Sequence, residues 1–152
     1  NPDRLQVRGI YEKAHKEIVE ADPSISYLDH PNVFCRLVPF WQLHLYFVEQ
    51  GRPDFYADLM EELRSLPPAG KGNESIRNQF VFMEKVCEVG QTDFTEFFEA
   101  WGFFQVGDFT IEDYGEYRFS VTEKMVADTK AAIQKLGVPP PAVNPLLLPA
   151  PQ

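Results

Sequence analysis

Apolar residues recur at intervals of three and four along most of the chain, and this spacing predicts helices. The first predicted helix opens near Pro2 and Asp3 and closes before Pro23. One face of this helix carries its apolar residues, which predicts that the helix is amphipathic and buries a single stripe. The stripe consists of Val7, Ile10, Tyr11, Ala14, Ile18 and Ala21.

The run from residue 34 to residue 47, FCRLVPFWQLHLYF, is apolar on almost every side. It predicts a central helix that starts at Asp29 or His30, just before Pro31, and ends at Gly51. Pro39 lies inside this run and is expected to kink the helix or to begin a new turn. Because a helix that is apolar all round must be enclosed by other elements, we expect the rest of the chain to be built around it.

Three more helices are predicted downstream. A third helix follows Pro53 and Asp54 and is ended by Pro67 and Pro68, and residues 69–72 read as a loop. Asn73 caps a fourth helix that ends at Gly90, and Thr92 caps a short fifth helix that ends at Gly102. Their stripes are, in order, Phe55, Leu59, Leu63 and Leu66; Ile76, Phe80, Met83 and Cys87; and Phe94, Phe97, Phe98 and Trp101.

The apolar period changes after the fifth helix. Two β-prone runs, 109–111 and 117–121, predict a small hairpin near residues 108–121. Ser120 and Glu123 have the spacing of a capping box ahead of a last helix, which runs to Leu136 and is stopped by Gly137 and Pro139. From residue 138 onward the chain is rich in proline, which predicts an extended tail or linker.

The expected fold is therefore mainly α, a compact bundle of about five to six helices with a small β-hairpin. A chain of 152 residues with 44% hydrophobic residues can bury one substantial core. We expect one helical domain over residues 1–137 and a proline-rich tail or linker over residues 138–152. The net charge of −9 leaves no basic surface for nucleic acid, and no window approaches the length of a membrane span.

Few residues of the sequence carry a recognisable chemistry. The three histidines, His15, His30 and His44, lack the HExxH spacing of zinc peptidases, so we expect no metal or cofactor in this chain. Cys35 and Cys87 exclude a disulfide framework but leave one bridge open, and a cysteine nucleophile with His44 as its base would lack a third group. The carboxylates that could act as acids or bases lie on predicted solvated faces. The aromatic stripe from Phe94 to Trp101 is more often core than a sugar platform, although Trp41, Tyr46 or Trp101 could stack on a glycan if one edge opened to a cleft.

Three segments in order resemble a known family. They are RLVPFWQLHLYF (36–47), DFYADLMEELR (54–64) and TDFTEFFEAWGFF (92–104), and they are similar to the C-terminal helical part of the enhancin-type, mucin-directed zinc metallopeptidases, the M60-like peptidases. The opening residues NPDRLQ, followed by IYEKA, resemble the piece that comes shortly after the zinc-binding region of this family. The resemblance covers roughly residues 1–136 and would place the HExxH helix and the third zinc ligand upstream of Asn1.

The resemblance implies a helical subdomain of a bacterial, secreted or cell-surface zinc metallopeptidase that acts on glycoproteins such as mucins. The subdomain would form a wall of the substrate cleft, its partners would be the upstream zinc-bearing half and the glycoprotein substrate, and by itself it would not be catalytic. Four polar residues of the central helix are candidates to face such a cleft; the alternative is that they form hydrogen bonds within the bundle. They are Arg36, Gln42, His44 and Tyr46.

A second interpretation of the chain is a stand-alone helical module that binds a protein or a glycan. The two interpretations differ in exposed apolar area. A half-domain taken from a larger enzyme should show a large apolar patch on one side, whereas a self-sufficient module should not.

Overall fold

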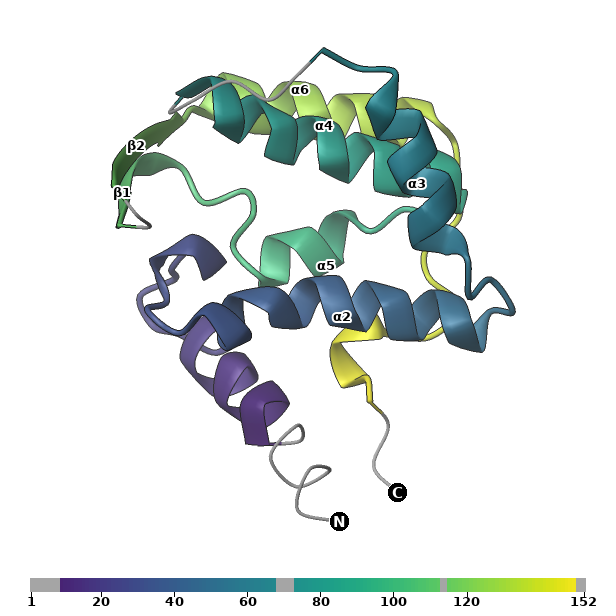
Figure 1. Cartoon of the computed structure of the whole chain (residues 1–152), viewed down its shortest axis with the longest axis horizontal. Coiled ribbons are helices and arrows are strands. Elements are labelled where there is room, and N and C mark those ends of the chain that lie inside the picture. Colours follow the sequence, from purple (N-terminus) through teal and green to yellow (C-terminus); the bar gives the residue numbers. More distant parts are fainter. Residues whose placement is uncertain (1–8, 68–72, 113–114, 150–152) are drawn as a thin grey trace.

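The computed structural model describes residues 9–67, 73–112 and 115–149. The described chain is mainly α with one antiparallel hairpin, as predicted (Figure 1). The first helix is α-helical over residues 9–14, the first described residues, and continues as a π-helical turn. The elements in order are η1 (His15–Val19), η2 (Tyr27–Asp29), α2 (Val33–Glu49), α3 (Phe55–Arg64), α4 (Asn73–Gly90), α5 (Thr95–Ala100), β1 (Gly107–Glu112), β2 (Glu116–Val121), α6 (Glu123–Lys135) and η3 (Pro145–Leu147).

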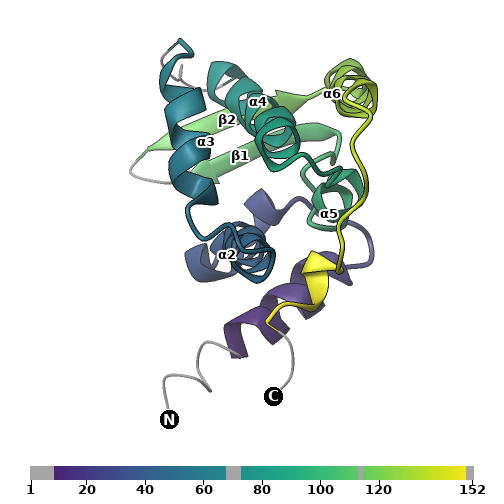
Figure 2. The same ribbon diagram turned by 90° about the vertical axis from the view of Figure 1, so that its right-hand side faces the viewer.

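The helices form layers around α2 and α5. Helices α4 and α6 lie side by side, and α3 packs against α4 (Figures 1 and 2). Helix α5 lies between this layer and α2, while the first helix and η3 lie on the other side of α2. The hairpin closes one end of the molecule, where β2 contacts α4 and β1 contacts η2. In the described ranges we find no helix long and apolar enough to cross a membrane.

Aromatic side chains fill the space between the layers. The four stripe residues of α5 and its flanks are all buried, as the sequence predicts. Phe47 of α2 stacks on Phe55 of α3 with ring centroids 3.6 Å apart, and Phe94 meets the Phe47 ring at an angle of 64°. This stacked and edge-on packing is the geometry that aromatic rings prefer, so α2, α3 and α5 share one continuous core.

Helix α2 runs as one segment through Pro39, which does not begin a new helix. It starts later than predicted, after Asn32, whose side chain accepts a hydrogen bond from the Phe34 amide at 2.8 Å. It ends before Gly51, which has a φ of 76° and is the left-handed residue expected at a helix end. The enclosure predicted for α2 is incomplete, because several large apolar side chains on one of its sides remain exposed to solvent.

Two of the predicted cap residues have other roles around α5. Thr92 does not cap the helix, because its hydroxyl donates to the carbonyl of Gly90 at the end of α4. Asp93 instead accepts a hydrogen bond from the Thr95 amide, directly where α5 starts. Gly90 is not in the left-handed conformation of a C-cap; Gln91 is, with a φ of 49°. Gly90 is needed for a different reason, since a Cβ atom there would lie 2.6 Å from the Phe47 ring.

The predicted capping box at Ser120 and Glu123 is also wrong. Ser120 belongs to β2, where it pairs with Asp108 of β1 and donates its hydroxyl to the Asp108 carboxylate at 2.6 Å. Thr122 caps α6 instead, by accepting a hydrogen bond from the Met125 amide. The strand therefore extends two residues further than the capping-box spacing suggests.

The described part of the predicted tail, residues 138–149, returns to the helices. Its first contact joins the Asp93 amide to the Pro139 carbonyl at 2.8 Å. The segment then passes along α2, where η3 packs, and Pro145 and Leu148 are buried. Residues 138–149 are therefore packed against the helices and do not form an extended tail. The prolines prevent a long helix, but their carbonyl groups and the neighbouring leucines still bind the bundle.

Candidate functional site

The four polar candidates of α2 do not come together in one site. A helix turns by about 100° per residue, so Gln42 and Tyr46 lie near one another while Arg36 and His44 lie on other sides of α2. Gln42 and Tyr46 are buried, and Arg36 and His44 are half-buried. Each residue must therefore be considered with its own surroundings.

Gln42 joins three parts of the chain. Its side-chain oxygen accepts a hydrogen bond from the indole nitrogen of Trp101 at 3.0 Å. Its amide nitrogen donates to the carbonyls of Leu146 and Leu148 at 3.2 and 2.9 Å. Nε2 of His15 donates to the same Leu146 carbonyl at 2.7 Å. A buried amide with all its strong partners supplied is a structural group in this domain, which is the alternative that the sequence left open.

Tyr46 has a similar role one turn later. Its hydroxyl accepts a hydrogen bond from the Ala142 amide at 3.0 Å, so it holds the C-terminal segment against α2. Its ring meets the rings of Phe47 and Phe94 edge-on, with centroids 5.2 Å away in both pairs. Tyr46 therefore connects the aromatic core to the returning segment.

His44 lies among aromatic rings on another side of α2. The Trp41 ring meets it edge-on at 5.8 Å, and the Tyr56 ring stacks on it at 6.2 Å. The Tyr56 hydroxyl donates to the Phe40 carbonyl, and burial raises the pKa of Tyr56. This arrangement fixes the position of the His44 ring at the edge of the domain.

Arg36 is the candidate with an unmet donor. Its Nε atom is buried and has no hydrogen-bond partner among the residues that the structure describes. The neighbouring Tyr27 donates to Gln79 instead, and burial raises the pKa of Tyr27 against the opposing effect of the Arg36 charge. Because buried donors are rarely left unpaired, Arg36, which is half-buried as a residue, is the one of the four with an unused buried donor in this part of the chain.

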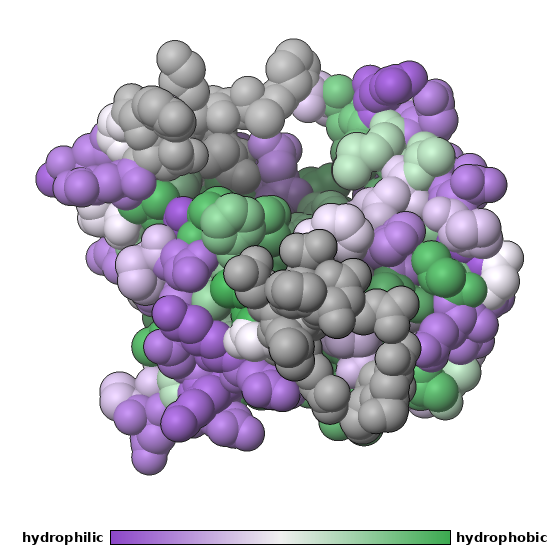
Figure 3. All heavy atoms as spheres, turned by 60° about the horizontal axis from the view of Figure 1, so that its bottom comes forward, coloured by the Kyte–Doolittle hydropathy of each residue, from purple (hydrophilic) through white to green (hydrophobic). Residues whose placement is uncertain are grey.

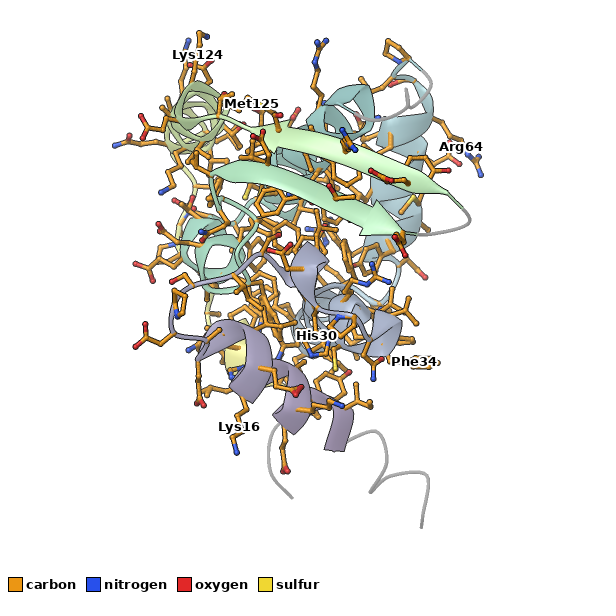
Figure 4. All side chains as sticks on the ribbon, turned by 90° about the vertical axis from the view of Figure 1, so that its left-hand side faces the viewer. Lys16, His30, Phe34, Arg64, Lys124 and Met125 are labelled. Atoms are coloured by element: carbon orange, nitrogen blue, oxygen red, sulfur yellow. The ribbon has the colours of Figure 1, made fainter. Side chains whose placement is uncertain are left out.

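Glu17, His30 and Cys35 form a cluster of possible metal ligands, whose nearest atoms lie within 4.8 Å of one another. His30 lies between the first helix and α2 (Figure 4). Its Nδ1 accepts a hydrogen bond from the Asn32 amide at 3.1 Å, so the proton of the neutral ring is on Nε2 and is donated to Glu17 at 3.0 Å. A metal at Nε2 would need that proton moved to Nδ1, where it would face an N–H group. The cluster therefore does not fit a zinc site.

The two cysteines are both buried and unpaired, which answers the question that the sequence left open. Burial raises the pKa of Cys87 to about 12 and raises that of Cys35 as well. We expect neither thiol to react with Ellman's reagent in the native protein at pH 8, because the thiolate is the reactive form. Both should react in denaturant. Rapid reaction of one thiol before unfolding would show an accessible thiolate and contradict this description.

A groove that the sequence analysis missed lies on the outer side of α2. Its volume is about 480 Å³, and it is bordered by the first helix and by Pro149. The signal was present in the sequence as positions 34, 37, 41, 45 and 48, which recur at helical spacing within the apolar run. Because the whole run was expected to be enclosed, this stripe was not separated from the buried one. The groove is lined mainly by Ile10, Tyr11, Phe34, Leu37, Trp41 and Leu45.

Comparison with known proteins gives consistent matches for this fold. The family model of peptidase M60, enhancin and enhancin-like proteins matches residues 6–102. A solved metallopeptidase from Bacteroides thetaiotaomicron aligns with a TM-score of 0.62 and 27% identity over 71% of this chain. A second metallopeptidase, solved in complex with Tn antigen, aligns with a TM-score of 0.67 and 24% identity over 77% of this chain. The curated proteins contain no match.

The chain is much shorter than the solved proteins that it matches. It covers 18% and 21% of the two solved metallopeptidases, so it spans about one fifth of their length. The matched region of the family model extends from the first helix to the end of α5. It includes α2 with all four polar candidates and the lining of the outer groove except Pro149.

Proposed function

Because the chain belongs to the peptidase M60, enhancin and enhancin-like family, we propose that it is a helical subdomain of a zinc metallopeptidase and forms one wall of the substrate cleft. The observation that carries this proposal is the family match over residues 6–102 in a chain whose histidines lack zinc-peptidase spacing. The zinc ligands and the general base would then lie in another part of the same enzyme. This subdomain would then shape the substrate cleft, and the part of the enzyme that holds the zinc would activate the water.

Zinc in the complete enzyme would lower the pKa of a bound water to generate the nucleophile. The contribution of this chain would be to bind and orient substrate. Arg36 is suited to this role because its side chain is only half-buried and its Nε atom has no partner among the described residues. The Nε atom is itself buried, so the guanidinium group would have to turn toward the cleft to hold a peptide carbonyl or to stabilise negative charge that develops on it.

The proposed substrate is a glycoprotein such as a mucin. Support comes from the family resemblance and from the Tn antigen bound to a metallopeptidase of similar fold. We propose that the complete enzyme is bacterial and is secreted or held at the cell surface, where such substrates occur.

The test is zinc content and mucin cleavage, measured on these 152 residues and on the complete gene product that contains them. We expect stoichiometric zinc and cleavage only in the complete product, because the described residues offer no fitting ligand set. Elemental analysis and electrophoresis of the digested mucin provide the two readouts. Zinc bound by the 152 residues alone, or neither zinc nor cleavage in the complete product, would contradict the proposal, and the second result would favour a stand-alone binding module.

A further inference from the structure

Helix α2 carries a row of large apolar side chains that face solvent. Phe34, Leu37, Trp41 and Val48 are 63%, 41%, 55% and 43% exposed. Figure 4 shows Phe34 pointing away from the body of the molecule. The spacing of three, four and seven residues places all four on one side of the helix, which we call the outer stripe. Single exposed apolar residues are ordinary, but a contiguous row of this kind marks a surface that another molecule or segment covers.

The groove beside the outer stripe favours an apolar occupant. Its floor and walls are almost entirely carbon, and they come from the first helix, α2 and Pro149. Figure 3 shows hydrophobic residues at the surface on the side of the molecule that lies below α2 in Figure 1. A glycan or another polar ligand needs several hydrogen-bonding groups to fix its orientation, and this groove does not offer them. A ridge of apolar side chains from a helix fits a groove between two helices.

Two occupants of this kind can be compared. A second copy of the chain would bring together two molecules that each carry a net charge of −9, which opposes self-association. The rest of a longer peptidase is already joined to this chain, so its docking needs no association of two separate molecules, and the solved metallopeptidases of this fold are about five times the length of this chain. We propose that the outer stripe and its groove dock an amphipathic helix from the remainder of the enzyme. This inference rests on the proposed function.

Hydroxyl-radical footprinting can test the docking surface directly. Labelling of Trp41 and Phe34 is measured in the 152-residue chain and in the complete gene product. Met60 and Tyr117, which are 45% and 37% exposed and lie outside the groove, serve as internal controls. We expect the labelling rates of Trp41 and Phe34 to fall at least five-fold in the complete product, while the rates of the two controls change less than two-fold.

A pair of variants gives an independent readout. Phe34→Ser combined with Trp41→Ser should lower the Tm of the 152-residue chain by only a few degrees, because each side chain is more than half exposed there and Trp41 loses its contact with His44. In the complete product the same variant should lower the Tm of this domain by at least twice as much. The matched variant Met60→Ser should lower neither. Equal effects of the double variant in both proteins would overturn the inference.

The outcomes separate this inference from the proposed function. Zinc and mucin cleavage in a complete product whose Trp41 is still labelled would overturn the docking surface and leave the function standing. Protection of Trp41 without zinc or cleavage would leave the docking surface standing and remove the function. Concentration-dependent protection in the 152-residue chain, with the mass of two copies, would overturn the inference in favour of self-association. A gene product with no sequence beyond these residues would also overturn it.

Discussion

Replacing Gly102 by alanine is expected to destabilise the domain by about 2–5 kcal/mol. Gly102 ends α5 with a φ of 77°, a left-handed conformation that costs an L-residue with a side chain about 1–2 kcal/mol. A Cβ atom would also lie 2.2 Å from the carbonyl oxygen of Ile25, which belongs to the main chain and cannot rotate away. Moving that backbone adds about 1–3 kcal/mol, as overpacking does elsewhere.

Two other glycines separate these contributions. Gly137 has a φ of 66° but open space around its Cβ position, so Gly137→Ala should show the left-handed cost alone. Gly9 has neither constraint, and Gly9→Ala should be neutral or slightly stabilising. The free energy of unfolding in urea measures all three variants. Equal losses for Gly102→Ala and Gly137→Ala would show that the contact with Ile25 is not important.

Replacing Gln42 by leucine is expected to cost about 3–5 kcal/mol and to release the C-terminal segment. Leucine is similar in size but can bond neither to the Trp101 indole nor to the carbonyls of Leu146 and Leu148. The indole N–H is fully buried and would remain unpaired, at about 1–3 kcal/mol for one such group. The bond to the Leu146 carbonyl is part-buried and the bond to the Leu148 carbonyl is buried, so both carbonyls lose their partner until the segment moves and water reaches them.

Urea unfolding and amide hydrogen exchange together test this expectation. In Gln42→Leu, the Leu148 amide should exchange faster than amides in the middle of α4, because the segment opens locally. Trp101→Phe serves as the second member of a double-mutant cycle. Because both changes remove the same hydrogen bond, the double variant should cost less than the sum of the two. Additive losses, or unchanged exchange at Leu148, would contradict the proposed role of Gln42.

The sequence predicted an element correctly where its apolar residues recur at helical spacing and a glycine is required at its end. Phe94, Phe97, Phe98 and Trp101 recur at helical spacing and are all buried, so α5 and its ending at Gly102 followed from the pattern alone. The hairpin was also predicted, because the change to β-prone runs is local. Two of the predicted start residues were wrong. Thr92 and Ser120 can both cap a helix, but the Thr92 hydroxyl is bonded back to the end of α4 and the Ser120 hydroxyl to the opposite strand, and spacing alone does not reveal either choice.

The surroundings of the candidate residues depended on distant parts of the chain. Gln42 and Tyr46 bond to backbone groups about one hundred residues later, in a segment whose prolines indicated a tail. No local pattern predicts such a pairing. The apolar run around Pro39 was misleading in another way. Its hydrophobicity on all sides predicted that α2 is enclosed, but it did not distinguish the side that this domain buries from the side that it leaves exposed. The structure resolves this by separating the buried stripe from the outer one.

The bond between His15 and the Leu146 carbonyl ties the beginning of the described chain to its end. Ile10, Tyr11 and Pro149 consequently border the same groove, and the first and last described segments lie on one side of the molecule (Figure 1). Any sequence that enters before this domain and any sequence that exits after it would thus start from neighbouring points. Flanking modules would therefore be tethered to a single pole of the domain, the one away from the hairpin.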